Sequence, residues 1–160
     1  MKTAAVVTVS DSSSRGERAD LSGPAVADLL RRYGFEVMHQ QVIPDEQEAI
    51  ESALMSLSDE VQLIVTTGGT GIADRDVTPE ATRAVCPRLI EGIPEKMRAA
   101  GLQHTPNAVL SRGVCGVRGQ TLIVNLPGST GGVRDGMAVL SRVLAHAVDQ
   151  ARGGDHPRSG

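Results

Sequence analysis

Short runs of β-branched and aliphatic residues alternate along this chain with segments whose apolar residues recur at helical spacing. The first pattern is typical of buried strands, and the second of helices with one face against a core. The strand-like runs cover residues 3–9, 35–43, 61–67 and 121–126. The helical segments begin near residues 22, 46, 78, 94 and 130, and the last is predicted to be one long helix with apolar positions from Val133 through Leu144.

Polar residues mark where several of these elements begin. Ser22 is placed to cap the first long helix, and Thr78, followed by proline and an acid, is placed to cap another. Residues 10–21 are polar and predict a loop. Residues 108–125 predict two extended segments that turn at residues 118–120. Strands therefore alternate with helices along most of the chain.

This alternation predicts an α/β fold: a single three-layer domain with a mostly parallel sheet and helices on both faces. The domain is expected to cover residues 1–152, followed by a flexible polar tail over residues 153–160. Ligands of such sheets bind beyond the carboxyl ends of the strands. The four loops that follow predicted strands, at residues 10–11, 44–45, 68–76 and 127–132, are therefore expected to line one crevice.

Composition narrows the function classes. The 160 residues fit one domain and contain one Tyr, one Phe and no Trp, with a net charge of -3. Base-stacking on aromatic side chains and a basic DNA-binding surface are thereby excluded, so no nucleic-acid partner is expected. Cys86 and Cys115 show neither disulfide nor metal-ligand spacing and suit a reducing compartment. No apolar run approaches the length of a membrane span, so a cytoplasmic protein without a membrane partner is expected.

The loop with the most specific composition is residues 68–71, Gly-Gly-Thr-Gly. Closely spaced glycines let backbone N–H groups approach an anion, which favours phosphate binding. The loop matches neither the Walker A pattern nor the G-x-G-x-x-G dinucleotide pattern, and an ordinary turn stays open as the alternative. A second glycine-rich loop covers residues 127–132 and has the same two interpretations.

Carboxylates lie beside these loops. Asp76 follows the first glycine-rich loop, and Asp45 follows another strand. A carboxylate next to a phosphate site needs a cation between the two, and Mg²⁺ commonly binds one or two carboxylates together with phosphate oxygens. The alternatives are that Asp76 is a helix-entry acid and Asp45 an N-cap. Ser111, Arg112 and Arg118 are candidate anion contacts.

Seven short segments, in order along the chain, together resemble one known family. They are residues 9–11 (VSD), 20–24 (DLSGP), 43–46 (IPDE), 66–71 (TTGGTG), 75–79 (RDVTP), 110–112 (LSR) and 125–128 (NLPG). The set is similar to the molybdopterin-binding MogA/MoaB family, which is related to the gephyrin G domain. The resemblance extends from residue 2 to about residue 151.

The resemblance implies a molybdopterin adenylyltransferase of molybdenum-cofactor biosynthesis. Such an enzyme transfers AMP from ATP to the terminal phosphate of molybdopterin with Mg²⁺ and releases pyrophosphate. The resemblance also implies a homotrimer or hexamer, and transfer of the product to a molybdenum-inserting enzyme. The alternative is a non-catalytic molybdopterin-binding or scaffold protein of the MoaB branch.

The resemblance assigns catalysis and metal binding to Asp45 and Asp76. Together with the loops described above, the candidate binding residues are Ser10, Asp11, Gly68, Gly69, Thr70, Gly71, Ser111, Arg112, Pro127 and Gly128. Adenine and pterin are both flat rings, yet Tyr33 and Phe35 are predicted to pack at the end of a helix and the start of a strand. We therefore expect aliphatic side chains, backbone amides and guanidinium planes to hold the rings. Many relatives have arginine where this chain has Ser12.

Overall fold

The computed structural model describes residues 1–154 and contains one six-stranded sheet with strand order β2-β1-β3-β6-β5-β4. The strands are β1 (Lys2–Val9), β2 (Phe35–Ile43), β3 (Leu63–Thr67), β4 (Arg88–Leu89), β5 (Cys115–Arg118) and β6 (Thr121–Leu126). The pairs β2–β1, β1–β3 and β3–β6 are parallel. The pairs β6–β5 and β5–β4 are antiparallel. The predicted mostly parallel sheet is confirmed.

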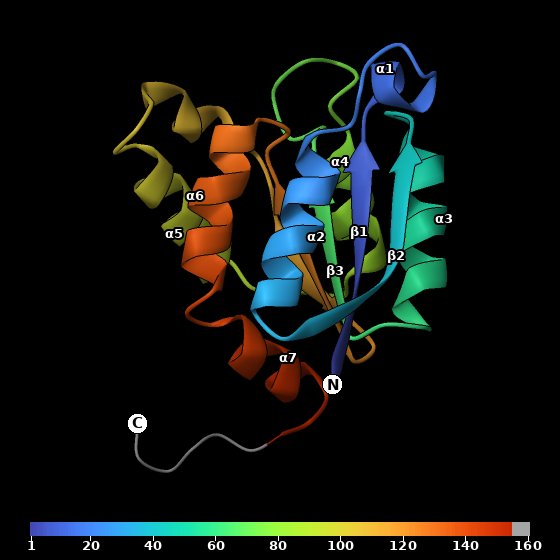
Figure 1. Ribbon diagram of the computed structural model, residues 1–160, viewed down its shortest axis with the longest axis vertical. Helices are drawn as coiled ribbons and strands as arrows, with labels where there is room; N and C mark the ends of the chain where they lie inside the picture. Colours follow the sequence, from blue (N-terminus) through green and yellow to red (C-terminus); the bar gives the residue numbers. More distant parts are fainter. Residues whose placement is uncertain (155–160) are drawn as a thin grey trace.

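Helices cover both faces of this sheet (Figure 1). They are α1 (Asp11–Ser14), α2 (Ser22–Arg32), α3 (Gln47–Ser58), α4 (Thr78–Val85), α5 (Gly92–Gly101), the 3-10 helix η1 (Pro106–Leu110), α6 (Thr130–Leu140) and α7 (Leu144–Ala151). α2, α6 and α7 bury side chains such as Leu30 and Met137 in one core, and α3 and α4 bury side chains such as Leu54 and Val85 in the other. The predicted three layers are therefore present.

The sheet contributes alternate residues to the two cores. Ala4 and Val6 of β1 face the core under α2 and α6, and Ala5 and Val7 face the core under α3. Successive side chains of a strand point to opposite faces, so a strand buried on both faces has a continuous apolar sequence. This is the physical reason for the unbroken apolar runs in the strands.

The carboxyl ends of β1, β2, β3 and β6 lie along one edge of the sheet, because these strands are parallel. Figure 1 shows α1 and the loop between β3 and α4 beyond this edge, above the arrowheads of β1 and β2. The four loops chosen from the sequence therefore meet at one end of the molecule.

Two predictions for the segment between β1 and α2, the loop over residues 10–21 and the cap at Ser22, are wrong. The predicted loop over residues 10–21 contains α1, because the Ser10 hydroxyl accepts a hydrogen bond from the Ser13 amide at 3.2 Å and caps a short helix. Ser22 lies inside α2 and does not cap it. Asp20 accepts from the Gly23 amide instead, at 3.0 Å, and the Ser22 hydroxyl bonds the Thr67 hydroxyl at 2.7 Å.

The proposed caps of the next two helices are also corrected. α3 follows Glu46 without a side-chain cap, and Asp45 accepts a hydrogen bond from the Asp11 amide instead. Thr78 is the first residue of α4, and its hydroxyl donates to the carbonyl of Gly68 at 3.0 Å. In both cases a partner distant in the sequence binds the side chain that local pattern assigns to the helix end.

The predicted long C-terminal helix is two helices, α6 and α7. The amides of Arg142 and Val143 donate to carbonyls three residues back, which tightens and ends α6. Apolar side chains on both sides of the break, Leu140 and Leu144, pack in the same core, so the apolar pattern continues across it.

The sequence pattern also gave no sign of β4 and η1. The turn predicted between two extended segments is present between β5 and β6, with Gly119 at φ 58°. Most of the predicted tail, residues 155–160, lies outside the described residues. Within residues 1–154, no helix has the length and apolarity required to span a membrane.

Candidate functional site

The loop after β3 carries two glycines in the left-handed region, Gly68 at φ 89° and Gly69 at φ 67°. A Cβ on Gly68 would collide with the carbonyl oxygen of Val9, and one on Gly69 would collide with the hydroxyl of Thr78. Gly128 is less crowded, since a Cβ there would lie 3.2 Å from the Cα of Gly68. Only glycine fits at Gly68 and Gly69, so the loop passes close to the neighbouring backbone.

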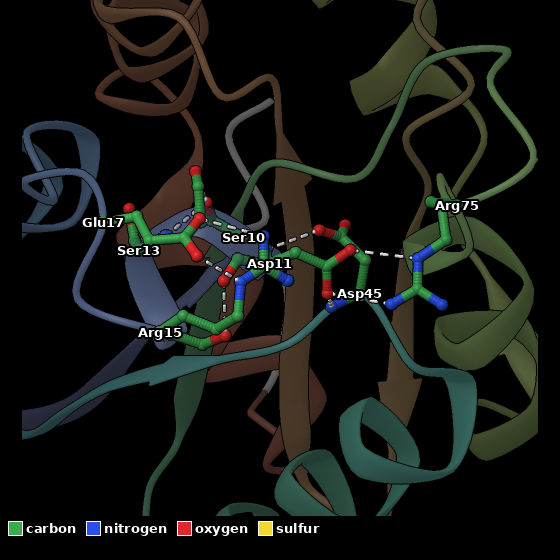
Figure 2. A network of polar contacts seen from close by, with 9 residues as sticks. Ser10, Asp11, Ser13, Arg15, Glu17, Asp45 and Arg75 are labelled. Carbon is green, nitrogen blue, oxygen red and sulfur yellow. Dashed lines mark hydrogen bonds and ion pairs between the residues drawn. The ribbon is translucent and has the colours of Figure 1, made fainter.

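Asp11, Asp45 and Arg75 form a network beside this loop, shown in Figure 2. The Asp11 amide donates to Oδ2 of Asp45 at 2.8 Å, and the Asp45 amide donates to Oδ1 of Asp11 at 2.9 Å. Arg75 donates from Nε and Nη2 to the two oxygens of Asp11, both at 2.9 Å. The network joins the loops after β1, β2 and β3.

The two carboxyls of this network have opposite pKa shifts. The hydrogen bonds from Arg75 and from the Asp45 amide hold the pKa of Asp11 below its usual value. Burial raises the pKa of Asp45, and the charges of Asp11 and Asp76 raise it further. Asp45 therefore lies in a site with excess negative charge, which a cation would offset.

Asp45 and Asp76 both approach the glycine-rich loop. Oδ1 of Asp45 lies 3.1 Å from the position of a Cβ on Gly69, and Oδ2 of Asp76 lies 2.8 Å from one on Gly71. Oδ2 of Asp76 also accepts from the Ala73 amide at 3.1 Å. Among the contacts within residues 1–154, each carboxylate therefore has one oxygen that accepts no protein hydrogen bond.

These residues fit Mg²⁺ bound together with a phosphate. Within residues 1–154, no group of three or more His, Cys, Asp or Glu side chains is placed to hold a metal ion. Mg²⁺ does not require such a group, since it typically takes one or two carboxylates together with substrate phosphates and water. Two carboxylates facing a glycine-rich loop match this donor set.

A cavity of about 630 Å³ opens beside the glycine-rich loop, between α6 and the segment from α5 to η1. Of the predicted residues, Thr70, Gly71, Ser111 and Pro127 line it. A second hollow of about 410 Å³ is lined by Asp45 among others. The predicted single crevice is therefore two hollows separated by the loop between β3 and α4.

Arg112 lines neither hollow. Its Nε donates to the carbonyl of Gly71 at 2.8 Å, and its Nη2 donates to the carbonyl of Asp76, also at 2.8 Å. Nη1 and Nη2 bind the carboxylate of Glu80 at 2.7 and 3.2 Å. The guanidinium of Arg112, predicted as an anion contact, thus binds two backbone carbonyls and a carboxylate of the protein itself.

The structure brings several further residues to the site. Arg75 is one, and its partner Asp11 is 64 residues away. The wall of the larger cavity includes Arg98 and His104, and Nδ1 of His104 lies 3.1 Å from Oδ2 of Asp135. No local spacing marks these residues, because the wall forms only when α5 packs beside α6.

Comparison with known protein families gives a match over most of the chain. Residues 5–146 match the family described as "Probable molybdopterin binding domain". The chain belongs to this family of molybdopterin-binding domains. The MogA/MoaB resemblance of the sequence is thereby confirmed.

Curated members of the molybdopterin-binding family are similar along most of the chain. A molybdopterin adenylyltransferase of Helicobacter pylori is 40% identical over 148 residues, covering 90% of this chain and 84% of the relative. A molybdopterin adenylyltransferase of Escherichia coli is 44% identical over 135 residues, covering 81% of this chain and 69% of the relative. Gephyrin of Dictyostelium discoideum is 37% identical over 89% of this chain and 21% of its own length.

Solved structures of the family have the same fold. The molybdopterin biosynthesis enzyme MoaB of Thermus thermophilus superposes with a TM-score of 0.90 at 46% identity, covering 96% of this chain and 98% of that one. The molybdopterin biosynthesis Mog protein of Mycobacterium ulcerans has a TM-score of 0.89 at 46% identity, covering 94% of this chain and 99% of that one.

Proposed function

We propose that this protein is a molybdopterin adenylyltransferase that acts in molybdenum-cofactor biosynthesis. It transfers AMP from ATP to the terminal phosphate of molybdopterin with Mg²⁺. The observation that carries the proposal is the approach of Asp45 and Asp76 to the glycine-rich loop, in a family whose members include molybdopterin adenylyltransferases.

The arrangement suits a reaction between two polyanions. A phosphate oxygen of molybdopterin attacks the α-phosphorus of ATP, a P–O bond forms, and the bond from the α-phosphorus to the bridging oxygen breaks to release pyrophosphate. The nucleophile is already an anion, so the protein needs no general base. Catalysis then depends on charge neutralisation and in-line positioning.

We assign metal binding, phosphate binding and positioning to different residues of the site. Asp45 and Asp76 would hold Mg²⁺, which neutralises phosphate charge when bound. Backbone amides of the glycine-rich loop hold phosphate oxygens. Asp11 and Arg75 fix Asp45, because the Asp11 amide binds one Asp45 oxygen and Arg75 holds the Asp11 carboxylate.

The flat rings are held without aromatic stacking. Phe35 is buried in the core, and the Tyr33 hydroxyl donates to the carbonyl of Met137 at 3.3 Å. Neither residue lines either hollow, whereas aliphatic residues such as Met97 and Ala108 line the larger one.

The proposal also includes a cytoplasmic homotrimer or hexamer that passes its product to a molybdenum-inserting enzyme.

A second candidate is a non-catalytic molybdopterin-binding or scaffold protein. The resemblance to the MoaB branch is its basis, although the MoaB of Thermus thermophilus is itself described as an enzyme. Such a protein would bind molybdopterin equally well with and without ATP, and substitution of Asp76 would leave that binding unchanged.

The test is an assay of pyrophosphate release and AMP incorporation with molybdopterin, ATP and Mg²⁺. We expect activity in the wild-type protein and a loss of about 100-fold or more in Asp76→Asn, since the substitution removes a metal-binding charge. The control is Asp59→Asn, which removes an exposed carboxylate after α3. Wild-type protein that binds molybdopterin but releases no pyrophosphate would reject the enzyme and support the scaffold.

A further inference from the structure

Arg112 lies behind the glycine-rich loop, on the side away from the larger cavity. Thr70 and Gly71 line that cavity and Arg112 does not, although it contacts both residues. We propose that Arg112 is a positioning residue. It orients the loop's amides toward substrate and holds Asp76 in place, and it does not bind a substrate phosphate. This inference rests on the proposed adenylyl transfer.

The contacts of Arg112 are with carbonyl groups of the loop. Its amide donates to the carbonyl of Thr70 at 2.8 Å, and its guanidinium donates to the carbonyls of Gly71 and Asp76, each at 2.8 Å. One residue thus binds both ends of the segment from Thr70 to Asp76. A guanidinium can do this because its donors lie in a rigid planar fork.

Peptide geometry then decides where the loop's amides point. The chain has no cis peptide bond among the described residues, and in a planar trans peptide the N–H points opposite to the preceding C=O. Because the carbonyls of Thr70 and Gly71 face Arg112, the amides of Gly71 and Ile72 face away from it. Within residues 1–154, neither amide donates a hydrogen bond to the protein. Both are available to an anion.

Asp76 is held at its backbone by the same guanidinium. Arg112 binds the Asp76 carbonyl, the Asp76 amide donates to the Ala73 carbonyl at 2.9 Å, and the Ala73 amide donates to Oδ2 of Asp76 at 3.1 Å. This closed turn fixes the direction of the Asp76 carboxylate. Loss of Arg112 would release the end of the turn that carries Asp76.

Glu80 keeps the guanidinium turned toward the loop. Its carboxylate accepts from Nη1 and Nη2 of Arg112, from the first turn of α4. Four hydrogen bonds from the side chain therefore go to the protein. One of the five guanidinium N–H groups, on Nη1, is left over, so a substrate phosphate could take only a single hydrogen bond from Arg112 without displacing Glu80 or a loop carbonyl.

The first experiment compares hydrogen exchange of residues 70–80 in the unliganded wild-type protein and in Arg112→Lys. A lysine has no fork and cannot bind both carbonyls and Glu80. We expect the amides of Ala73, Asp76 and Thr78, which donate within the loop, to exchange about tenfold faster or more. The control is Arg118→Lys, because the Arg118 side chain donates to the Val85 carbonyl at 3.1 Å, at the end of α4 away from the loop. Unchanged exchange in Arg112→Lys would overturn the inference.

The second experiment is a double-mutant cycle on kcat/KM for molybdopterin, with Arg112→Lys, Glu80→Gln and the pair. We expect a decrease of about 10- to 100-fold in Arg112→Lys, a smaller decrease in Glu80→Gln, and a double variant within about threefold of Arg112→Lys. A direct phosphate contact predicts instead that Glu80→Gln has no effect or improves KM, which would overturn the inference. If Arg112→Lys does not fold, Glu80→Gln alone decides between these outcomes.

The two proposals fail separately. Wild-type protein without AMP transfer would reject the proposed function, and the exchange experiment would still decide whether Arg112 positions the loop. Active wild-type protein with unchanged loop exchange in Arg112→Lys would reject the positioning role alone.

Discussion

At the scale of single residues, Asp45 has the least favourable electrostatic position in the site. It is partly buried beside Asp11 and Asp76, whose charges raise its pKa, and the charge of Arg75 offsets this effect in part. A raised carboxyl pKa means that the folded state binds the proton more strongly than the unfolded state does. The ionised carboxylate therefore destabilises the unliganded fold.

Asp45→Asn is expected to raise the melting temperature of the unliganded protein at pH 7 by about 2–4 °C. The wild-type protein loses stability as pH rises from the unfolded pKa, 3.8, through the raised pKa of the folded state. Asparagine does not titrate, so the two proteins should have similar melting temperatures below about pH 4 and separate above it. Thermal unfolding between pH 3 and pH 8 measures this difference.

The control and a second measurement use the same assay. Asp59→Asn, at an exposed position, should leave the pH dependence unchanged. Mg²⁺ should raise the melting temperature of the wild-type protein and leave that of Asp45→Asn unchanged, because a ligand stabilises only a protein that binds it. A less stable Asp45→Asn protein at pH 7 would contradict this account of the site.

Gly68→Ala is expected to destabilise the protein by about 3 kcal/mol or more, because it combines a left-handed backbone with a collision against the Val9 carbonyl. Gly16→Ala is the matched control. Gly16 has φ 74° but nothing within 4 Å of its Cβ position, so only the backbone strain of about 1 kcal/mol applies. Urea unfolding measures both variants. Equal losses would show that the loop can move away from Val9.

At the scale of elements, the loop between β3 and α4 is held from three directions. Thr78 of α4 binds the carbonyls of Gly68 and Gly69, Arg112 binds three other carbonyls, and Arg75 reaches across to Asp11. Each contact joins the loop to a different part of the chain. The loop can therefore keep one conformation although it lacks regular secondary structure.

Asn125 of β6 links the elements beneath this loop. Its side-chain amide donates to the hydroxyls of Thr66 and Thr82, both at 3.0 Å, and its oxygen accepts from the Val114 amide at 3.1 Å. Asn125→Asp would replace the buried donor with a carboxylate oxygen, and we expect a loss of about 3 kcal/mol in the free energy of unfolding.

The matched control is Gln103→Glu, which makes the same amide-to-acid change at an exposed position after α5. It should change the free energy of unfolding by less than about 0.5 kcal/mol. Urea unfolding at pH 7 measures both variants. An Asn125→Asp protein as stable as the control would show that these side-chain contacts do not hold α4 to the sheet.

At the scale of the whole molecule, the sheet brings the site together. β1 pairs with β2 on one side and β3 on the other, and β3 pairs with β6, all in parallel. Their carboxyl ends therefore lie at one edge, and two loops separated by more than 100 residues, those after Val9 and Leu126, both lie against the loop after β3. Two buried cores hold this sheet between its helices.

Some of this arrangement could be predicted because it depends on local chemistry. The apolar runs predict β1, β3 and β6, since strands buried on both faces must be apolar throughout, whereas β2 lies at the edge of the sheet and keeps polar residues among its apolar ones. The glycines and aspartates of the loops could be selected for the same reason, because a close backbone approach requires glycine and Mg²⁺ prefers carboxylates. The break between α6 and α7 could not, because Leu140 and Leu144 continue one apolar pattern and the break contains neither glycine nor proline.

The sequence by itself therefore determined the layers, the parallel strands, the family resemblance and the choice of Asp45 and Asp76. Only the tertiary structure decided how Asp11, Arg75 and Arg112 are used. The sequence identifies Arg112 as a cation but not as a partner of the loop. The loop atoms that its guanidinium binds are the carbonyls of Asp76 and Gly71, 36 and 41 residues away, and every residue carries such a carbonyl. Which carbonyls it meets depends on how the folded sheet places its loops.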